Sequence, residues 1–538
     1  MRNAKTRVGN TNLKREAYKS GLLLDLGFLL LLGVSMMGLG WIGYHGVDDL
    51  AYAIAAADWA TEGPGLGANH WALRYPVVFP TSISFWVFGI NELALVLPSI
   101  LSFLGIIGLT YSFLRTHFDR ISGLAAGVLV ATTPQFSNYA SWAGVELIEV
   151  LLVSSSLWLF ATAPKQRPVK TLLLSGLVAG LAWSTRETAV SILVLYGVCF
   201  VLGYRYTRTQ YLAWAAGFIG VIGLELLLLG LATGNPLYRW ELDLAHVHCT
   251  PNDAAFLVRT AAWNWITAPL AVLAGDGAHG LLYLLAIISG GFLLFRNLPR
   301  AERQVVFLFI ALALIHYVIV GHVAHLRMAR YYAIITYVAV LVLGITFSYA
   351  TRYERLRMAA YLVMVTLLAS SLIVTGLRSG DRTFAARTVA DFVMDERTQV
   401  YTDLRTRRMA TFFFLDNRPL TDFVRSDPPP PGAWFFFDFS QTRQYGVNRS
   451  QHGAPPLTAV PIDWEKIAEI KPETPLFDLI LEATALRMFL PNRAKAWRDT
   501  RRAPVILYRT PEHGGPTAPA AGQSFSRPAR CDPWLQVK

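Results

Sequence analysis

Long apolar runs recur along most of the chain, and they constrain its fold more than any other feature. A helix of about 20 predominantly apolar residues spans the hydrocarbon core of a bilayer. We expect about eleven such helices, over residues 21–44, 92–114, 121–139, 143–162, 171–185, 188–204, 211–233, 278–296, 304–321, 331–350 and 358–377. With 54% hydrophobic and 16% charged residues, the composition excludes an ordinary soluble protein. The sequence therefore predicts a polytopic α-helical membrane protein.

Short basic loops follow every second apolar run. The positive-inside rule assigns these loops, together with the basic residues 1–20, to the cytoplasm. Their basic residues include Arg115, Arg120, Lys165, Arg167, Lys170, Arg205, Arg208, Arg296, Arg300, Arg303, Arg352, Arg355 and Arg357. They also account for the net charge of +12, and they form no continuous basic stripe of the kind that nucleic-acid binding requires. We expect a bacterial inner-membrane protein with a cytoplasmic N-terminus and a periplasmic C-terminus.

The hydropathy falls sharply after about residue 378. The segments TQVYTD, WFFFDF and PVILYRT read as strands, and ARTVADFVMDE reads as a helix. We therefore expect three parts: a cytoplasmic segment at 1–20, a transmembrane domain at 21–377, and a small periplasmic α/β or α+β domain at 378–538. Whether Cys249 and Cys531 form a disulfide is left open.

The first polar stretch of the chain runs from His45 to Glu92 and opens with adjacent carboxylates, Asp48 and Asp49. One interpretation is that either residue caps the N-terminus of the helix LAYAIAAADWA. The other is catalysis, since an acid pair held at a membrane surface costs desolvation and needs a reason to be there. The two roles are compatible.

Other ionisable residues lie beside the apolar runs on the same outer side. Glu146 is either a carboxylate that reaches out to water or part of a site. Arg186 and Glu187 suggest a local ion pair that closes a tight outer turn. The loop GHVAHLRMARYY brings positive charge, including Arg330, to the side where it is normally scarce, so an anion is expected there.

Four motifs in register resemble those of a known class of membrane enzymes. They are Asp48-Asp49-Leu50-Ala51-Tyr52, the segment Arg74-Tyr75-Pro76, FGINELALVLPS from Phe88 to Ser99, and ARYYAIITY from Ala329. Together they resemble the GT-C membrane glycosyltransferases, in particular the branch of protein O-mannosyltransferases and lipid A aminoarabinose transferases. The resemblance covers residues 20–377.

This resemblance implies a polyprenyl-phosphate sugar donor, an active site on the outer face and inversion at the anomeric carbon. It places the catalytic base at Asp48, and it places Glu92 and Glu146 near a divalent metal such as Zn, Mg or Mn. Asp49, the second acid of the pair, is expected to be a cap or to orient the base. Arg330 falls where the family binds the lipid phosphate. The expected substrate-binding residues are Tyr52, His70, Arg74, Tyr75, Arg186, His325, Arg327, Arg330 and Tyr331. The chain departs from the family pattern at Val96, Ser141, Glu146 and Arg186.

The leading hypothesis is transfer of a sugar from a polyprenyl-phosphate carrier to an envelope acceptor. The acceptor is left open among lipid A, a glycan, a lipid and a protein, and the sugar is also left open. A lipid or glycolipid flippase is the alternative from another class. Transporters tend to show internal repeats and charges near the midplane of the membrane. Here no convincing repeat is visible and the charges gather at one interface, which favours the transferase.

Overall fold

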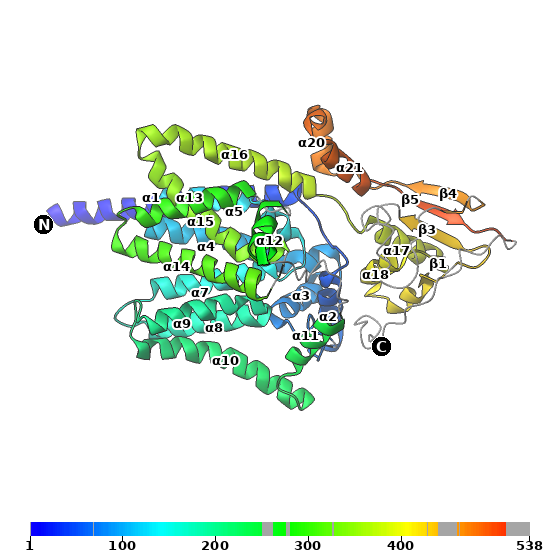
Figure 1. Cartoon of the computed structure of the whole chain (residues 1–538), viewed down its shortest axis with the longest axis horizontal. Coiled ribbons are helices and arrows are strands. Elements are labelled where there is room, and N and C mark those ends of the chain that lie inside the picture. Colours follow the sequence, from blue (N-terminus) through cyan, green and yellow to red (C-terminus); the bar gives the residue numbers. More distant parts are fainter. Residues whose placement is uncertain are drawn as a thin grey trace.

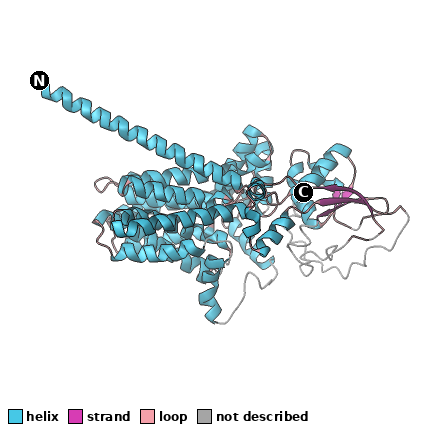
Figure 2. Ribbon diagram, turned by 90° about the horizontal axis from the view of Figure 1, so that it is seen from above, coloured by secondary structure: helices cyan, strands magenta, loops and turns pink. Residues whose placement is uncertain are grey.

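The computed structural model describes residues 2–67, 69–249, 262–275, 280–324, 326, 328–427, 429–438, 460–461 and 463–512. Its long helices form a bundle, and the part of the chain that follows α16 lies at one end of that bundle (Figure 1). Seen from above, α1 extends beyond the opposite end of the bundle, towards the N-terminus (Figure 2). The two ends of the bundle therefore differ: one carries the N-terminal extension and the other faces the C-terminal part.

Every predicted apolar run overlaps one of the longer helices of the bundle, although the run at 121–139 extends beyond its helix, which ends at Thr132. These helices are α1 Arg2–Leu39, α4 Glu92–His117, α5 Arg120–Thr132, α7 Glu146–Thr162, α8 Val169–Thr185, α9 Val190–Val201, α10 Arg208–Thr233, α13 Gly280–Phe295, α14 Arg300–Val318, α15 Ala333–Thr351 and α16 Glu354–Arg378. Among the described residues, six helices are long and apolar enough to cross a membrane, or up to eight if each of two bent pairs is one span. The count of eleven spans therefore stays a prediction.

The bundle is centred on α15. In the apolar stretch of this helix 83% of the residues are buried, whereas only 11% are buried in that of α10 and 17% in that of α16. Small residues allow close helix approach, as is common between helices in membranes. A Cβ added at Gly344 of α15 would lie 2.6 Å from the Cβ of Ala126 in α5, and one at Gly217 of α10 would lie 2.2 Å from the carbonyl oxygen of Leu173 in α8. Larger side chains at these glycines would push the helices apart.

Short elements gather at the end of the bundle that faces the C-terminal part (Figure 1). Figure 1 labels α2 Asp48–Glu62, α3 Tyr75–Phe88, α11 Tyr238–Cys249 and α12 Ala262–Gly275 there. The other short elements before α15 are α6 Pro134–Ser137, η1 Tyr139–Ser141, η2 Glu187–Ala189, the π-helical turn η3 Ile319–Val323 and the 3₁₀ turn η4 Ala329–Tyr332. The helix expected after Asp48 is confirmed as α2. The expected cap is wrong, because Val47 occupies the N-cap position without a side-chain hydrogen bond to the helix. Asp49 instead accepts the backbone N–H groups of His45 at 2.5 Å and Val47 at 2.7 Å, and so fixes the loop before α2.

After α16 the chain forms a mixed sheet with helices. Its elements are α17 Phe384–Glu396, β1 Val400–Tyr401, α18 Leu404–Ala410, η5 Thr411–Phe414, η6 Arg418–Phe423, β2 Val424–Arg425, β3 Trp434–Asp438, β4 Glu465–Ile470, α20 Leu476–Ala483, η7 Leu486–Phe489, α21 Asn492–Arg501 and β5 Val505–Arg509. The strand order is β2-β1-β3-β5-β4, with β1 parallel to β2 and β3 and with β5 antiparallel to β3 and β4.

The three strands and the helix expected here fall on β1, β3, β5 and α17. The central strand β3 buries Phe435, Phe436 and Phe437, which explains its continuous aromatic sequence. Strands β2 and β4 are not among the expected strands, since β2 has only two residues and β4 is mostly exposed, with charged side chains at three of its six positions. The Cys249 side chain and Cys531 lie outside the described residues, and so does any disulfide between them.

Candidate functional site

An ion pair between Asp48 and Arg330 joins the start of α2 to the turn η4 before α15. Nη1 of Arg330 donates to Oδ2 of Asp48 at 2.8 Å, and Nε of Arg330 lies 4.0 Å from Oε1 of Glu146. Both partners stay partly accessible, with 18% of the Arg330 side chain and 28% of the Asp48 side chain exposed. The guanidinium also lies near the rings of Tyr331 (5.3 Å) and Trp142 (5.9 Å). A carboxylate and a guanidinium thus meet at an accessible point at the end of the bundle.

Behind this pair, Arg186 is buried between two carboxylates of α7. Its Nη1 lies 3.4 Å from Oε1 of Glu146 and 3.7 Å from Oε2 of Glu149. Its guanidinium carbon lies 4.0 Å from the centre of the Tyr331 ring, a cation–π contact. Glu146 is only 2% exposed, so the interpretation that its carboxylate reaches out to water is wrong. Thr188 completes the group by donating to Glu149 at 2.6 Å.

A third arginine, Arg74, precedes α3 and binds α2. It donates to the hydroxyl oxygen of Tyr52 at 2.9 Å and to Oε2 of Glu187 at 3.3 Å. Glu187 also accepts from Nη2 of Arg239 in α11 at 2.5 Å. The local ion pair predicted between Arg186 and Glu187 is therefore wrong. The backbone of Arg186 is extended (φ −160°, ψ 139°), and consecutive side chains on extended backbone point to opposite sides.

The two adjacent aspartates have different environments. Burial favours the neutral form of Asp48, but the charges of Arg330, Arg74 and Arg186 outweigh it and lower the pKa of Asp48 below its ordinary value. Asp49 is fully buried, and this raises its pKa to about 7 in spite of the two backbone donors. Asp48 is consequently an ionised, accessible carboxylate, whereas Asp49 is an internal one that holds the backbone.

Three buried N–H donors of this region lack a hydrogen-bond partner among the described residues: Nε of Arg74, Nε of Arg330 and Nε1 of Trp142. Leaving such donors unpaired costs free energy, so each of them calls for an acceptor. Since two of the three are guanidinium nitrogens, an anionic group is the acceptor that best matches them.

Several of the predicted site residues do not contact the Asp48–Arg330 pair and have partners elsewhere. Glu92 accepts the backbone N–H of Tyr44 at 2.9 Å and Nη2 of Arg387 in α17 at 2.7 Å, which ties the bundle to the C-terminal part. His70 lies 3.7 Å from a carboxylate oxygen of Asp243. The remaining predicted residues are Tyr75, which stacks on Trp59, and His325 and Arg327, which lie outside the described residues.

The metal ligands implied by the resemblance do not fit a metal site. Glu92 is paired with Arg387, whereas Glu146 is paired with Arg186, so each carboxylate is already bound to a cation. Over the described ranges there is no group of three or more His, Cys, Asp or Glu side chains that could hold an ion.

Three residues of this region were missed from the sequence: Trp142, Glu149 and Arg239. Glu149 had a usable signal, since it lies one turn beyond Glu146 in an otherwise apolar helix, and an ionisable residue there is a candidate by default. Arg239 and Trp142 had none, because their partners come from distant parts of the chain.

Residues 76–228 match the family model described as dolichyl-phosphate-mannose-protein mannosyltransferase. A comparison of the sequence with curated proteins found no match. The structure resembles the crystal structure of ArnT from Cupriavidus metallidurans in the apo state, with a TM-score of 0.56 and 12% identity over 93% of this chain and 100% of ArnT. It also resembles the Archaeoglobus fulgidus oligosaccharyltransferase in complex with Zn and sulfate, with a TM-score of 0.51 and 13% identity over 78% of this chain and 68% of that one. The protein is thus a multi-pass membrane protein with the fold of the GT-C glycosyltransferases, which confirms the resemblance carried by its motifs.

Proposed function

We propose that the protein is an inverting glycosyltransferase that moves a sugar from a polyprenyl-phosphate donor to an envelope acceptor at the periplasmic membrane face. The observation that carries this proposal is the contact between Asp48 and Arg330, which brings the proposed base to within 2.8 Å of the proposed phosphate ligand. The family model matched by residues 76–228 is named for transfer from a lipid-linked phosphate sugar, in agreement with this chemistry.

Asp48 acts as the general base. The hydroxyl or amine of the acceptor attacks the anomeric carbon on the face opposite the phosphate, and the Asp48 carboxylate takes its proton. The bond between the anomeric carbon and the phosphate oxygen breaks, and polyprenyl phosphate leaves with the electron pair. Attack from the opposite face inverts the anomeric centre. The lowered pKa of Asp48 keeps it ionised and able to accept the proton at neutral pH.

Arg330 binds the phosphate of the donor and stabilises the charge that develops as the carrier leaves. A guanidinium grips phosphate oxygens with two parallel donors, and its Nε has no hydrogen-bond partner within the described residues. Because Arg330 also holds Asp48, the donor phosphate competes with that carboxylate. Donor binding therefore loosens the ion pair and frees Asp48 for its role as base.

The surrounding residues support this arrangement. Arg186 and Arg74 add positive potential, Tyr52 and Tyr331 orient these two guanidinium groups, and Tyr331 also flanks the isoprenoid near the interface. His70, Tyr75, His325 and Arg327 remain proposed substrate contacts, and Asp49 fixes the backbone next to the base. We derive no step through a divalent metal, because the carboxylates that would hold it are paired with arginines.

The proposed setting is the bacterial inner membrane. Residues 1–20 are cytoplasmic, 21–377 form the catalytic membrane domain, and 378–538 are periplasmic. The acceptor would enter between the bundle and the C-terminal part, because α2, which begins at Asp48, lies at the end of the bundle that faces this part (Figure 1).

The deciding experiment uses the purified full chain in liposomes that contain a radiolabelled polyprenyl-phosphate sugar. Transfer of label to an envelope extract, lost in Asp48→Asn and retained in Asp58→Asn, supports the proposal. Asp58 is a matched control, since it lies on the same helix and its carboxylate pairs with Arg418. Scrambling of the lipid across the bilayer without any sugar transfer would overturn the proposal in favour of a flippase.

A further inference from the structure

A compact helical segment, α20–η7–α21, connects β4 to β5 and lies beside the end of α16 (Figure 1). Phe477 and Leu481 of α20 are buried against Met36 and Leu39 at the end of α1. Gly376 in the last turn of α16 leaves room for the Phe477 ring, which lies 2.1 Å from where a Cβ would be. The segment is thus seated on the ends of two helices that are long and apolar enough to span a membrane.

The buried side chain of Arg498 holds the segment against the end of α16. Nε of Arg498 in α21 donates to Asp478 of α20 at 3.0 Å, and its Nη1 donates to the carbonyl oxygens of Ser379 at 2.5 Å and Leu377 at 3.2 Å. The last carbonyls of a helix lack partners within the helix, so Arg498 satisfies the end of α16. The orientation of the segment relative to α16 is therefore fixed by directional bonds as well as by apolar contacts.

The segment also carries large apolar side chains that remain exposed. Met488 is 65% exposed and Phe489 is 77% exposed, although both are large and apolar. They belong to a set of exposed side chains made up of Leu476, Leu479, Ile480, Leu486, Met488 and Phe489. Neighbouring apolar side chains that remain exposed together mark an interaction surface. We call this set the apolar face.

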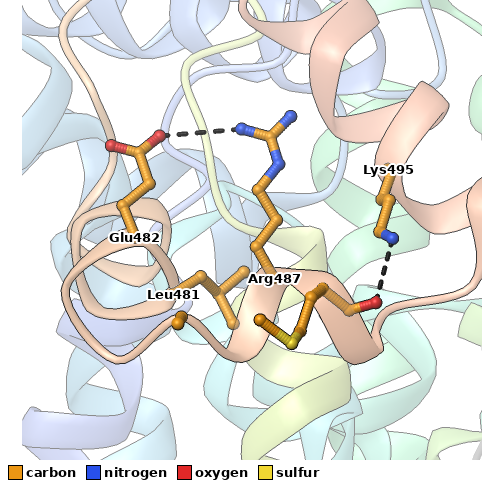
Figure 3. A pocket seen from close by; sticks show the side chains of 6 residues that line it. Leu481, Glu482, Arg487 and Lys495 are labelled. Atoms are coloured by element: carbon orange, nitrogen blue, oxygen red, sulfur yellow. Dashed lines mark hydrogen bonds and ion pairs between the residues drawn. The ribbon is translucent and has the colours of Figure 1, made fainter.

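Charged groups border the apolar face. In Figure 3, Arg487 points towards Glu482, and Lys495 donates to the carbonyl oxygen of Met488 at 3.0 Å, around a hollow that Leu481 also lines. Apart from Arg498 and Asp478, which are buried together, residues 476–502 contain five basic and two acidic side chains. A positively charged border next to an apolar face is typical of helices that lie in the boundary between lipid headgroups and acyl chains.

The neighbours of the segment identify what covers the apolar face. The sides of α1 and α16 are also exposed and apolar, with Leu31 68% exposed and Leu372 and Ile373 each 46% exposed, and in a spanning helix such side chains contact acyl chains. Because the segment sits on the ends of these two helices, its apolar face continues their lipid-facing surface to the level of the headgroups. Lysine and arginine at that level place their charges among lipid phosphates.

We propose that α20 and η7 form an interfacial membrane anchor: their apolar face enters the bilayer at the end of α1 and α16, and the basic side chains around it contact anionic headgroups. The anchor lies between β4 and β5 in the chain, so it fixes the sheet relative to the membrane surface. This inference does not depend on the proposed chemistry, because it concerns only how the C-terminal part meets the bilayer.

The test uses the full chain in nanodiscs, in a background in which Cys249 and Cys531 are replaced by serine. A fluorophore on Phe489→Cys is compared with one on Ile467→Cys in β4, a matched control because Ile467 is also apolar and is 42% exposed. Lipids that carry a nitroxide high on the acyl chain quench only nearby dyes. We expect a clear loss of fluorescence at position 489 and little loss at 467. Equal quenching at the two positions would overturn the anchor.

Two further measurements distinguish lipid from a second copy of the chain as the partner of the apolar face. Adding Leu479→Asp, an exposed substitution that leaves the buried contacts intact, should reduce the quenching at position 489. Replacing part of the phosphatidylcholine of the nanodisc by phosphatidylglycerol should increase the quenching, and Lys495→Glu should cancel that increase. A different result would overturn the proposal. If lipid nitroxides do not quench the dye, and if the dye in detergent becomes more shielded as the protein concentration rises, the apolar face contacts a second copy of the chain.

Discussion

Arg330 and Asp48 are 282 residues apart in the sequence, yet their side chains form a hydrogen-bonded ion pair of 2.8 Å. The pair connects α2 with the turn that opens α15, which has the largest buried share of the six candidate spans among the described residues. In the proposed reaction one partner binds the phosphate and the other removes a proton. Their contact therefore links donor binding to the activity of the base.

Replacing Asp48 by Asn should reduce turnover by a factor on the order of a hundred or more, because general-base catalysis contributes about that much. Asn keeps the size of the side chain but cannot take the proton. Since the change also releases Arg330, binding of the carrier should be retained. Sugar transfer and carrier binding measured on the same preparation check both expectations, with Asp58→Asn as the control. Turnover close to the wild-type value in Asp48→Asn would rule out this base.

Removal of Arg330 should weaken binding of the carrier itself. Loss of a charged hydrogen bond costs about 1.5–3 kcal/mol, so the affinity of Arg330→Ala for polyprenyl phosphate should fall roughly ten- to a hundredfold. Arg330→Lys should restore only part of it, because an ammonium group lacks the two parallel donors of a guanidinium. Isothermal titration with polyprenyl phosphate measures this. Arg303→Ala, an exposed change in the first turn of α14, is the control. Unchanged affinity in Arg330→Ala would show that the residue does not bind the phosphate.

Asp49 should make the stability of the protein depend on pH. Its pKa is raised by burial to about 7 in the folded protein, so between about pH 4 and about pH 7 the folded state binds more protons here than the unfolded state. Its contribution to stability is therefore fully present at the acid end of this window and is lost as the pH rises through it. In Asp49→Asn this contribution is absent. The difference in melting temperature between wild type and variant should shrink as the pH rises, and a constant difference would contradict the raised pKa.

The sequence alone was informative about the helices, because each apolar run imposes one. It also indicated that Asp48 and Arg330 would lie on one face, since hydropathy and loop charge assign both to the outer side. It did not indicate the partner of Arg186. Sequence neighbours suggested Glu187, but the extended backbone at Arg186 directs that arginine into the bundle, to Glu146 and Glu149.

For Glu92, too, the sequence did not indicate the partner of the charged side chain. In the sequence it is a carboxylate that opens an apolar helix, a position that fits a site as well as a structural contact. Its partner, Arg387, follows 295 residues later in a part of the chain whose placement against the bundle has no local signal. Tertiary contacts of this kind depend on how two separate units meet, and no periodicity or motif encodes that.

Glu92 leads to a prediction about metal dependence. Because its carboxylate binds Arg387 and the N–H of Tyr44, Glu92→Gln should lower the melting temperature modestly and leave the metal content unchanged. Arg387→Gln is the matched change on the other partner and should have a similar effect, with no further loss when the two are combined. Melting curves and elemental analysis before and after chelation check this. A bound divalent ion that disappears specifically in Glu92→Gln would contradict the assignment.

Arg186 should matter more for folding than Arg330. Its side chain is 4% exposed and lies between Glu146 and Glu149, each with a side chain 3% exposed. Removing one partner of a buried ionic group leaves uncompensated charge and costs about 3–5 kcal/mol. We therefore expect Arg186→Ala to lower the stability in detergent far more than Arg330→Ala, because the Arg330 pair is partly accessible to water. Adding Glu149→Gln to Arg186→Ala removes one of the stranded charges and should recover part of the loss, whereas the exposed change Arg303→Ala should have little effect. Thermal unfolding of the four variants gives the ranking, and a stability of Arg186→Ala equal to that of Arg303→Ala would show that the two glutamates do not depend on this cation.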